Sequence, residues 1–285
     1  MINYRIWQSG HLEKMPAVPS GAAGLLALLE KPVIRPAKKQ DCRGGCPSVS
    51  EGNGSPSSPE PASSISPLCV CAAGSGGKTS LIWALQRAGI QQKRRVLVTT
   101  TTHMMLPEAM LKDGTAAGIP VTPPLRSEDL IKCQSPGVER LDTLRSGCDL
   151  MLIEADGSRR LPLKVPASHE PVIPPWANVI LVVSGLSALG HPLRQVCHRY
   201  QLLEASPEFF FPEKPGPDAP VTAALMGKLM ASRYLRPLSL QHPEALILPV
   251  WNQADTPALI RAAGQAARAC GYPLQLITCM KDEAS

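Results

Sequence analysis

"LCVCAAGSGGKTSLIWALQRAG", residues 68–89, is the stretch that decides the fold. It begins with a short apolar run, typical of a buried strand, and ends in a segment with helical spacing that closes at Gly89, a suitable C-terminal cap. A glycine-rich turn lies between the two. A turn that joins a strand to a helix in this way directs backbone N–H groups and the helix N-terminus at one point, where an anion binds.

Each residue type in this turn suits a phosphate group. The glycines let the backbone approach phosphate oxygens, Lys78 can reach the β- and γ-phosphates, and the Thr79 hydroxyl is a ligand for Mg²⁺. Ala72 stands where the usual pattern has its first glycine, and a methyl group is tolerated there if φ stays negative. The alternative is a glycine-rich turn with a solvated lysine. The candidate nucleotide-binding residues are Gly74, Ser75, Gly76, Gly77, Lys78, Thr79 and Ser80.

A second motif, "DLMLIEADGSRR" at residues 149–160, has an apolar strand that ends in two carboxylates. Glu154 and Asp156 are two residues apart, so we expect them on the same side of the strand, where paired acids beside a phosphate loop suit Mg²⁺ and an attacking water. Arg160, with its neighbour Arg159, is placed to neutralise an oxyanion. The alternative is an ordinary strand-end turn with solvated acids. The predicted catalytic residues are Lys78, Glu154, Asp156 and Arg160, and the predicted metal ligands are Thr79, Glu154 and Asp156.

A third motif, "WNQAD" at residues 251–255, matches the pattern of loops that bind guanine. Asp255 is placed to accept hydrogen bonds from the guanine ring N–H and amine, while Asn252 braces the loop. Asp255 and the two residues after it also look like the start of a helix. The base therefore stays open between ATP and GTP, and Asn252 and Asp255 are candidate nucleotide contacts.

The order of the motifs along the chain predicts how they come together. Six apolar runs alternate with helical patterns, at residues 68–71, 96–100, 150–155, 179–184, 245–251 and 274–280. This alternation predicts an α/β fold of the P-loop nucleotide-binding type, three layers deep, with a mostly parallel sheet of about six strands. The motifs follow the first, third and fifth runs, and ligands of such sheets bind along the carboxyl ends of the strands.

Two other polar segments accompany the strands. Residues 101–103, "TTH", leave the second strand at the same edge and suit a switch that senses the γ-phosphate, or simply a polar turn. Residues 161–174 hold a lysine, a histidine and a glutamate between prolines, so we expect a rigid polar loop able to cover a second substrate.

Composition divides the 285 residues into two parts. Residues 1–67 form an N-terminal segment, with a short helix predicted near 24–31. Residues 47–67 consist almost wholly of Pro, Ser, Gly and acidic residues, so we expect them to be disordered. The predicted nucleotide-binding domain occupies residues 68–285.

Charge and hydropathy limit the partners. The net charge of +6 suits an anionic ligand, but the basic residues are scattered and aromatic residues make up only 4%, so nucleic acid is not expected as a partner. No apolar run approaches the ~20 residues needed to cross a bilayer, so no membrane partner is expected. Most cysteines lie in apolar segments, as thiols of a reducing compartment do, and we expect a cytoplasmic protein. Cys42 and Cys46 have metal-binding spacing, yet one pair cannot complete a four-ligand site.

Residues 68–285 resemble the YqeC family of selenium-dependent molybdenum hydroxylase accessory proteins, on the motifs "AGSGGKTSL", "VLVTTTTHM", "LIEADGSRRLPLKVPASHEPVIP", "VVSGLSALGHPL" and "NQAD". The resemblance implies a role in selenium cofactor biosynthesis, with no assigned reaction, and a molybdenum hydroxylase or another maturation protein as partner. It also favours Glu154 as first metal ligand, by similarity to maturation proteins for nickel and molybdenum enzymes. We expect Mg²⁺-dependent binding of ATP or GTP with hydrolysis or phosphoryl transfer. The alternative is a non-catalytic, nucleotide-gated carrier.

Overall fold

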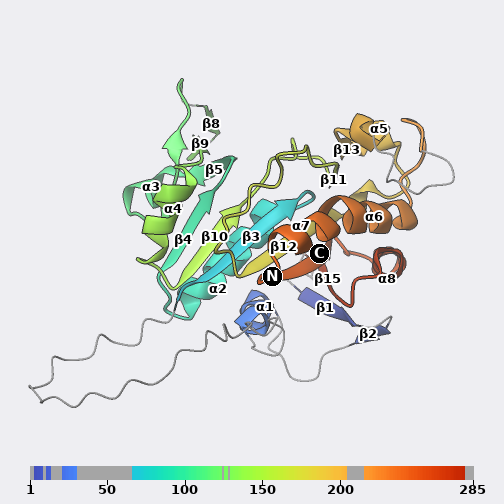
Figure 1. Ribbon diagram of the computed structural model, residues 1–285, viewed down its shortest axis with the longest axis horizontal. Coiled ribbons are helices and arrows are strands. Elements are labelled where there is room, and N and C mark those ends of the chain that lie inside the picture. Colours follow the sequence, from blue (N-terminus) through green and yellow to red (C-terminus); the bar gives the residue numbers. More distant parts are fainter. Residues whose placement is uncertain are drawn as a thin grey trace, which may run out of the picture.

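The computed structural model describes residues 3–8, 11–13, 21–30, 66–123, 125–127, 129–203 and 215–279. A mostly parallel sheet of nine strands runs through this part of the chain, in the order β2-β1-β15-β14-β12-β3-β10-β4-β6. Helices pack on both of its faces (Figure 1). The structure therefore confirms an α/β protein with a mostly parallel sheet.

The six apolar runs of the sequence all form neighbouring strands of this sheet. They are β3 (Leu68–Gly74), β4 (Val96–Thr100), β10 (Leu150–Glu154), β12 (Val179–Gly185), β14 (Leu246–Asn252) and β15 (Leu274–Cys279). Each adjacent pair from β15 to β4 runs parallel. Every residue of the five strands from β14 to β4 is buried, because packed layers cover both faces.

The sheet separates two apolar cores. Along β3, Cys69 and Cys71 belong to one core and Val70 and Ala72 to the other, as the alternation of a strand requires. The first core is completed by α6 (Ala223–Met230), α7 (Arg236–Gln241) and α8 (Pro257–Cys270), and the second by α1 (Ala22–Glu30) and α2 (Lys78–Gln91). The protein thus has three layers.

The described N-terminal residues differ from the expected boundary at Leu68. Strand β1 (Asn3–Gln8) pairs antiparallel with β15, and β2 (His11–Glu13) pairs with β1, so both strands extend the main sheet. The predicted short helix is found as α1, whose buried leucines pack in the same core as α2. Residues 31–65, with Cys42, Cys46 and most of the predicted disordered stretch, lie outside the described residues.

Shorter elements accompany the long strands and helices of the main sheet. A small antiparallel sheet contains β5 (His103–Pro107), β9 (Leu130–Gln134), β7 (Ile119–Pro120) and β8 (Arg126–Ser127). The other short elements are β6 (Ala116–Ala117), α3 (Glu108–Lys112), α4 (Val138–Arg145), β11 (Leu163–Lys164), α5 (Leu193–Val196) and β13 (Cys197–His198), with 3-10 helices at Leu186–Ala188 and Tyr200–Leu203 and a π-helical turn at Ala231–Leu235. Within the described ranges, no helix combines the length and apolar character needed to span a membrane.

Candidate functional site

The strand order brings the predicted motifs to one edge of the sheet. The chain moves from β3 to β4 on one side of β3, and later passes from β10 to β12 on its other side. Such a change of direction opens a crevice at the carboxyl ends of the strands. Here the crevice is a cavity of about 740 Å³, lined by the turn after β3, the end of β10 and the loop after β14. Its volume is in the range of small-molecule sites.

The turn after β3 depends on glycine. Gly74 and Gly76 have φ of 89° and 78°, a region that side-chain-bearing residues rarely adopt. A Cβ on Gly74 would overlap the carbonyl oxygen of Val183, and a Cβ on Gly76 would overlap the backbone of Gly185. The Ser75 N–H also donates to the Val183 carbonyl over 2.8 Å. The turn therefore packs directly on the backbone of β12.

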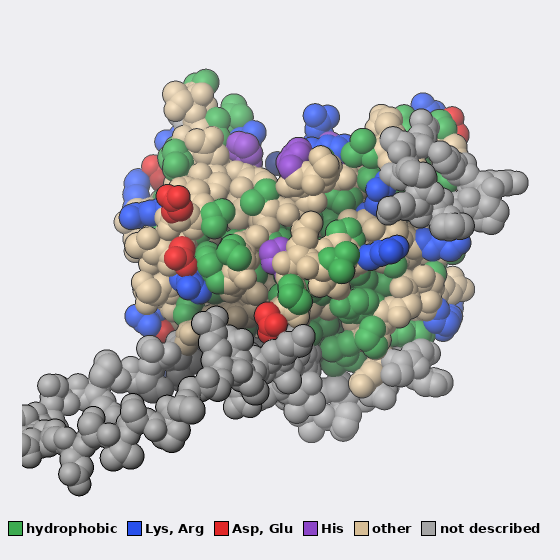
Figure 2. Space-filling model, viewed as in Figure 1, with side chains coloured by type: hydrophobic (Ala, Val, Ile, Leu, Met, Phe, Trp, Pro, Cys, Tyr) green, Lys and Arg blue, Asp and Glu red, His purple; other side chains and the backbone are tan. Residues whose placement is uncertain are grey.

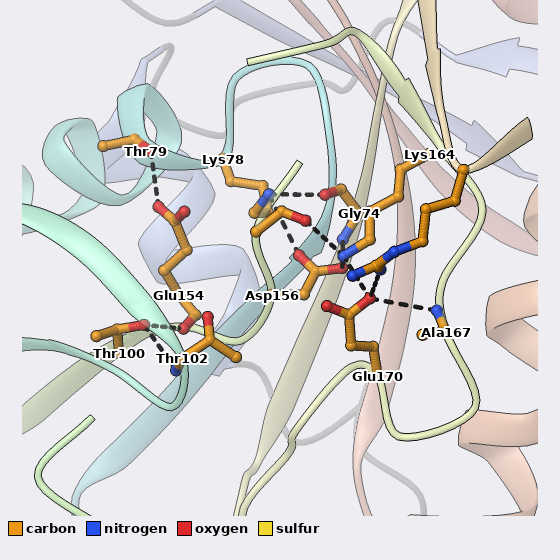
Figure 3. Close-up of polar contacts among 12 residues, drawn as sticks. Gly74, Lys78, Thr79, Thr100, Thr102, Glu154, Asp156, Lys164, Ala167 and Glu170 are labelled. Atoms are coloured by element: carbon orange, nitrogen blue, oxygen red, sulfur yellow. Dashed lines mark hydrogen bonds and ion pairs between the residues drawn. The ribbon is translucent and has the colours of Figure 1, made fainter. Parts of the chain in front are cut away.

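Lys78 begins α2 at the end of this turn and is only 4% exposed. Its ammonium folds back on the turn: Nζ donates to the Gly74 carbonyl over 2.6 Å and lies 3.2 Å from Oδ1 of Asp156 (Figure 3). Lys78 also lines the cavity. A phosphate in the cavity would therefore compete with these two partners for the ammonium.

Glu154 ends β10 in the wall of the same cavity. Its Oε2 accepts a hydrogen bond from the Thr79 hydroxyl over 2.6 Å (Figure 3). Burial raises the pKa of the Glu154 carboxyl, against the opposing effect of the Lys78 charge. A desolvated carboxylate beside a threonine hydroxyl offers a cation two hard oxygen ligands. The structure thus brings two of the three predicted metal ligands together.

The donor set fits Mg²⁺ better than a metal that needs a protein cage. No group of three or more His, Cys, Asp and Glu residues suited to a metal occurs in the described part of the chain. Mg²⁺ is usually held by one or two protein oxygens together with substrate phosphates and water. Thr79 and Glu154 supply such oxygens next to the glycine turn.

Asp156 does not face the cavity as the sequence analysis expected. Its side chain is fully buried, and it is absent from the cavity wall. Its Oδ2 accepts the Gly74 N–H over 3.1 Å, while Oδ1 pairs with Lys78. The expectation assumed strand alternation through residue 156, but β10 ends at Glu154. Asp156 therefore braces the glycine turn, and both oxygens of its carboxylate are bound to protein groups.

A chain of buried charges continues from Asp156. The Lys164 Nζ lies 3.0 Å from Asp156 Oδ2 and 2.9 Å from Glu170 Oε2, and it donates to the Gly157 carbonyl over 2.6 Å. Arg199 pairs with the same oxygen of Glu170. Burial acts to raise the pKa of Glu170, but hydrogen bonds from Lys164 and Arg199 lower it to about 2. Ion pairs thus tie the polar loop of residues 161–174 to the glycine turn.

Arg159 and Arg160 lie at the rim of the cavity with exposed side chains. Both have left-handed backbone conformations, with φ of 50° and 62°. Such conformations cost of order 1 kcal/mol each in residues other than glycine and concentrate at functional sites. Figure 2 shows Lys, Arg and His side chains along the upper edge of the molecule, around a notch beside the small β5–β9 sheet. Arg160, which the sequence predicts to neutralise an oxyanion, is therefore one of the residues that line the cavity.

The loop after β14 separates the two predicted base contacts. Asn252 is 2% exposed; its Nδ2 donates to the Gly76 carbonyl over 2.7 Å, and its Oδ1 accepts from the Thr278 hydroxyl over 2.8 Å. Asn252 thus braces the glycine turn from the side opposite Asp156. Asp255 is absent from the cavity wall and accepts from the Cys279 thiol over 3.2 Å.

Gln253 occupies the cavity wall instead of Asp255. A left-handed backbone, with φ of 65°, orients Gln253, and its Oε1 accepts from the Ser187 hydroxyl over 2.6 Å. Thr256, which follows the motif, caps α8 by accepting the Leu259 N–H over 3.2 Å. The helix start inferred from sequence is confirmed, with Thr256 as the capping residue.

Of the predicted switch residues 101–103, only His103 lines the cavity. The Thr101 hydroxyl donates to the Val172 carbonyl over 2.7 Å, and the Thr102 N–H donates to the Thr100 hydroxyl over 3.0 Å. Sequence reasoning missed Lys132, Ser187 and Gln253 in the wall and Arg199 in the charge chain. Gln253 stands inside the motif at residues 251–255, whereas Lys132 reaches the cavity only through the small β5–β9 sheet, which no local pattern in the sequence predicts.

The fold and the site together define an α/β protein with a glycine-rich strand-to-helix turn beside a carboxylate-bearing strand. The family model described as YqeC protein matches residues 70–201, which contain the turn, both carboxylates and the 161–174 loop. These residues therefore belong to the YqeC family, which confirms the resemblance to that family over this part of the chain.

Comparison with curated proteins supports the same family. Over 139 residues the chain is 39% identical to the uncharacterized protein YqeC of Escherichia coli (strain K12), an alignment that covers 44% of this chain and 54% of the relative. The chain thus spans about half the length of the curated relative that it matches. No solved structure matches the chain.

We predict that Glu154→Gln stabilises the protein in the absence of metal. Because folding raises the pKa of Glu154, the neutral carboxyl is favoured in the folded state and the ionised carboxyl destabilises the fold. The stability that the neutral form gives is fully present below the unfolded-state pKa and is lost as pH rises through the folded-state pKa. Glutamine stays neutral at every pH and avoids this loss. At pH 8 the variant should therefore melt about 2 °C or more above wild type, and the difference should vanish near pH 4. Thermal melts in chelator measure this.

Added Mg²⁺ and nucleotide should reverse the order, since the variant lacks the carboxylate ligand. Glu244→Gln, in an exposed turn away from the cavity, is the matched control and should leave all melts unchanged. A lower melting temperature of Glu154→Gln at pH 8 in chelator would contradict the role of burial.

Proposed function

We propose that this chain is a protein of the P-loop type that binds a nucleoside triphosphate with Mg²⁺. The phosphates of the nucleotide would lie along the turn after β3. The observation that carries the proposal is the turn itself, with left-handed glycines packed on β12 and Lys78, Thr79 and Glu154 around one cavity. Among the described residues, no acceptor takes the N–H groups of Gly76 and Gly77. Such groups at a helix N-terminus are phosphate ligands.

The charge of the cavity wall supports the same ligand. Lys132, Arg159 and Arg160 face the single carboxylate Glu154, while the charge of Lys78 is matched by Asp156 below the turn. Two positive charges therefore remain in excess. A nucleoside triphosphate with one bound Mg²⁺ carries about −2 at neutral pH, so it would neutralise the wall.

The proposed chemistry is hydrolysis or phosphoryl transfer. Thr79 and Glu154 would hold Mg²⁺, which supplies charge neutralisation at the β- and γ-phosphates when bound. Lys78 and Arg160 would bind the phosphate oxygens that gain charge as the terminal group leaves. Asp156 keeps the turn in shape and takes no direct part.

One observation favours the second candidate, a nucleotide-gated carrier. Among the residues that the structure describes, the cavity wall holds a single carboxylate, Glu154, and its Oε2 already accepts the Thr79 hydroxyl. With Asp156 buried, no second acid in the wall is free to orient a water. A partner protein would then supply the missing group or perform the chemistry itself.

The place of this activity in the cell is also a proposal, supported by the family resemblance alone. It would serve maturation of a selenium-containing molybdenum cofactor, with a molybdenum hydroxylase or another maturation protein as partner. The first test is therefore nucleotide binding by the chain itself, and the second is turnover with and without such a partner.

Lys78→Ala should weaken triphosphate binding by about 1.5 to 3 kcal/mol, because a charge-assisted contact to phosphate is lost. Calorimetric titration with a non-hydrolysable triphosphate and Mg²⁺ measures the change. Lys112→Ala, an exposed lysine of α3 outside the cavity wall, is the control and should bind like wild type. Equal affinities of Lys78→Ala and wild type would remove the phosphate-loop proposal.

Asp255→Asn should leave the preference among GTP, ATP and XTP unchanged, because Asp255 contacts the Cys279 thiol and is not in the cavity wall. Gln253→Ala should alter base preference by about threefold or more, since its side chain lines the cavity. Competition binding with the three nucleotides decides between these residues. A gain of XTP over GTP in Asp255→Asn would restore Asp255 as the guanine contact.

Steady-state phosphate release separates an enzyme from a carrier. If the chain is a complete NTPase, release should be measurable with purified protein and Mg²⁺, and Lys78→Ala should lower it about 100-fold. If it is a carrier, wild type and Lys78→Ala should show the same background rate even though Lys78→Ala binds nucleotide more weakly. Release that appears only with added molybdenum hydroxylase would identify the partner as the source of the missing group.

A further inference from the structure

The buried charges under the glycine turn contain two lysines on one carboxylate. Lys78 contacts one oxygen of Asp156, and Lys164 contacts the other, at 3.2 and 3.0 Å (Figure 3). The side chains of Lys164 and Asp156 are both 0% exposed. We propose that Lys164 is a positioning residue that holds Asp156 in place and leaves Lys78 free to move to the phosphates. This inference rests on the proposed function.

The first step concerns the partners of Lys78. Its ammonium is bound to the Gly74 carbonyl and to Asp156, and a phosphate in the cavity would draw the ammonium away from the buried carboxylate. If Lys78 were the sole cation on Asp156, its departure would leave a buried carboxylate without a counter-charge. Removing one partner of a buried pair is strongly unfavourable, so that loss would oppose nucleotide binding.

The second step concerns what Lys164 supplies. Its ammonium contacts Asp156 Oδ2, the same oxygen that accepts the Gly74 N–H over 3.1 Å. Asp156 therefore keeps a counter-charge and its hold on the turn after Lys78 has moved. Gly74 starts the turn in a left-handed conformation, so a fixed Asp156 also fixes the turn.

The third step concerns why Lys164 itself stays in place. It donates to the Gly157 carbonyl over 2.6 Å and pairs with Glu170, which in turn pairs with Arg199 and accepts the Ala167 N–H over 3.2 Å. Figure 3 shows Glu170 and Ala167 on the side of Asp156 away from Lys78. Lys164 thus has no competing route to the cavity, and it is absent from the cavity wall.

A double-mutant cycle on nucleotide affinity tests the proposal. Lys164→Gln removes the charge but keeps a donor, so Lys78 is needed on Asp156 and affinity for a non-hydrolysable triphosphate with Mg²⁺ should fall about tenfold or more. In the Lys78→Ala background no lysine has to move, so the same Lys164→Gln change should alter affinity less than about threefold. Lys164→Arg keeps the charge and should restore most of the affinity.

The outcomes separate this inference from the proposed function. Absence of nucleotide binding by the wild type overturns both. Binding by the wild type with equal losses for Lys164→Gln in the two backgrounds overturns only the inference, because a purely structural role of Lys164 acts alike in both. Failure of Lys164→Arg to restore affinity, with the variant folded by circular dichroism, also overturns it.

A second variant covers the case in which Lys164→Gln does not fold. Glu170→Gln removes the other carboxylate charge on Lys164 but keeps an oxygen that can accept from it, and Lys164 retains Asp156 and the Gly157 carbonyl, which still hold it in place. Affinity for the triphosphate should then equal or exceed that of wild type. A loss of about tenfold in folded Glu170→Gln would overturn the inference, because it would mean that nucleotide binding depends on the outer ion pairs and not on the charge at Asp156.

Discussion

The buried carboxylate of Asp156 is the group on which the rest of the site depends. It binds the N–H of Gly74, the ammonium of Lys78 and the ammonium of Lys164, and no part of it contacts solvent. A carboxylate in such a place is stable only if cations and N–H groups replace the water that it has lost. The two lysines and the form of the turn are therefore requirements of one buried charge.

The glycine turn is held from three sides, and each side belongs to a different strand. Asp156 follows β10, the Val183 carbonyl comes from β12, and the Asn252 amide ends β14. Because these strands are neighbours or next neighbours of β3 in a parallel sheet, their carboxyl ends lie side by side at the same edge of the sheet. The sheet thus shapes the turn before any ligand arrives, which lowers the cost of ordering it upon binding.

Sequence reasoning found the strands and the turn because their signals are local. Continuous apolar runs reveal strands buried on both faces, and glycines between a strand and a helix reveal the turn. It failed at Asp156, because alternation applies only inside a strand and β10 ends two residues earlier. It also failed at β1, a strand that pairs with β15 from the other end of the chain, since no local pattern records a partner so distant.

The site has a buried part, here called the floor, whose side chains are fixed, and an exposed part, the rim, whose side chains can adjust. This division follows from the burial of the side chains. Lys78, Asp156 and Asn252 are nearly inaccessible and each makes two or more polar contacts, so their positions are set by the fold. Arg159 and Arg160 are exposed, so their long side chains keep rotamer freedom that a bound anion would remove. The floor can therefore recognise phosphate by geometry at little entropic cost, whereas the rim recognises it by charge at a higher one. In the proposed function, movement of Lys78 from the floor to the ligand joins the two, since Lys78 is the one described lysine that belongs to both the buried charge chain and the cavity wall.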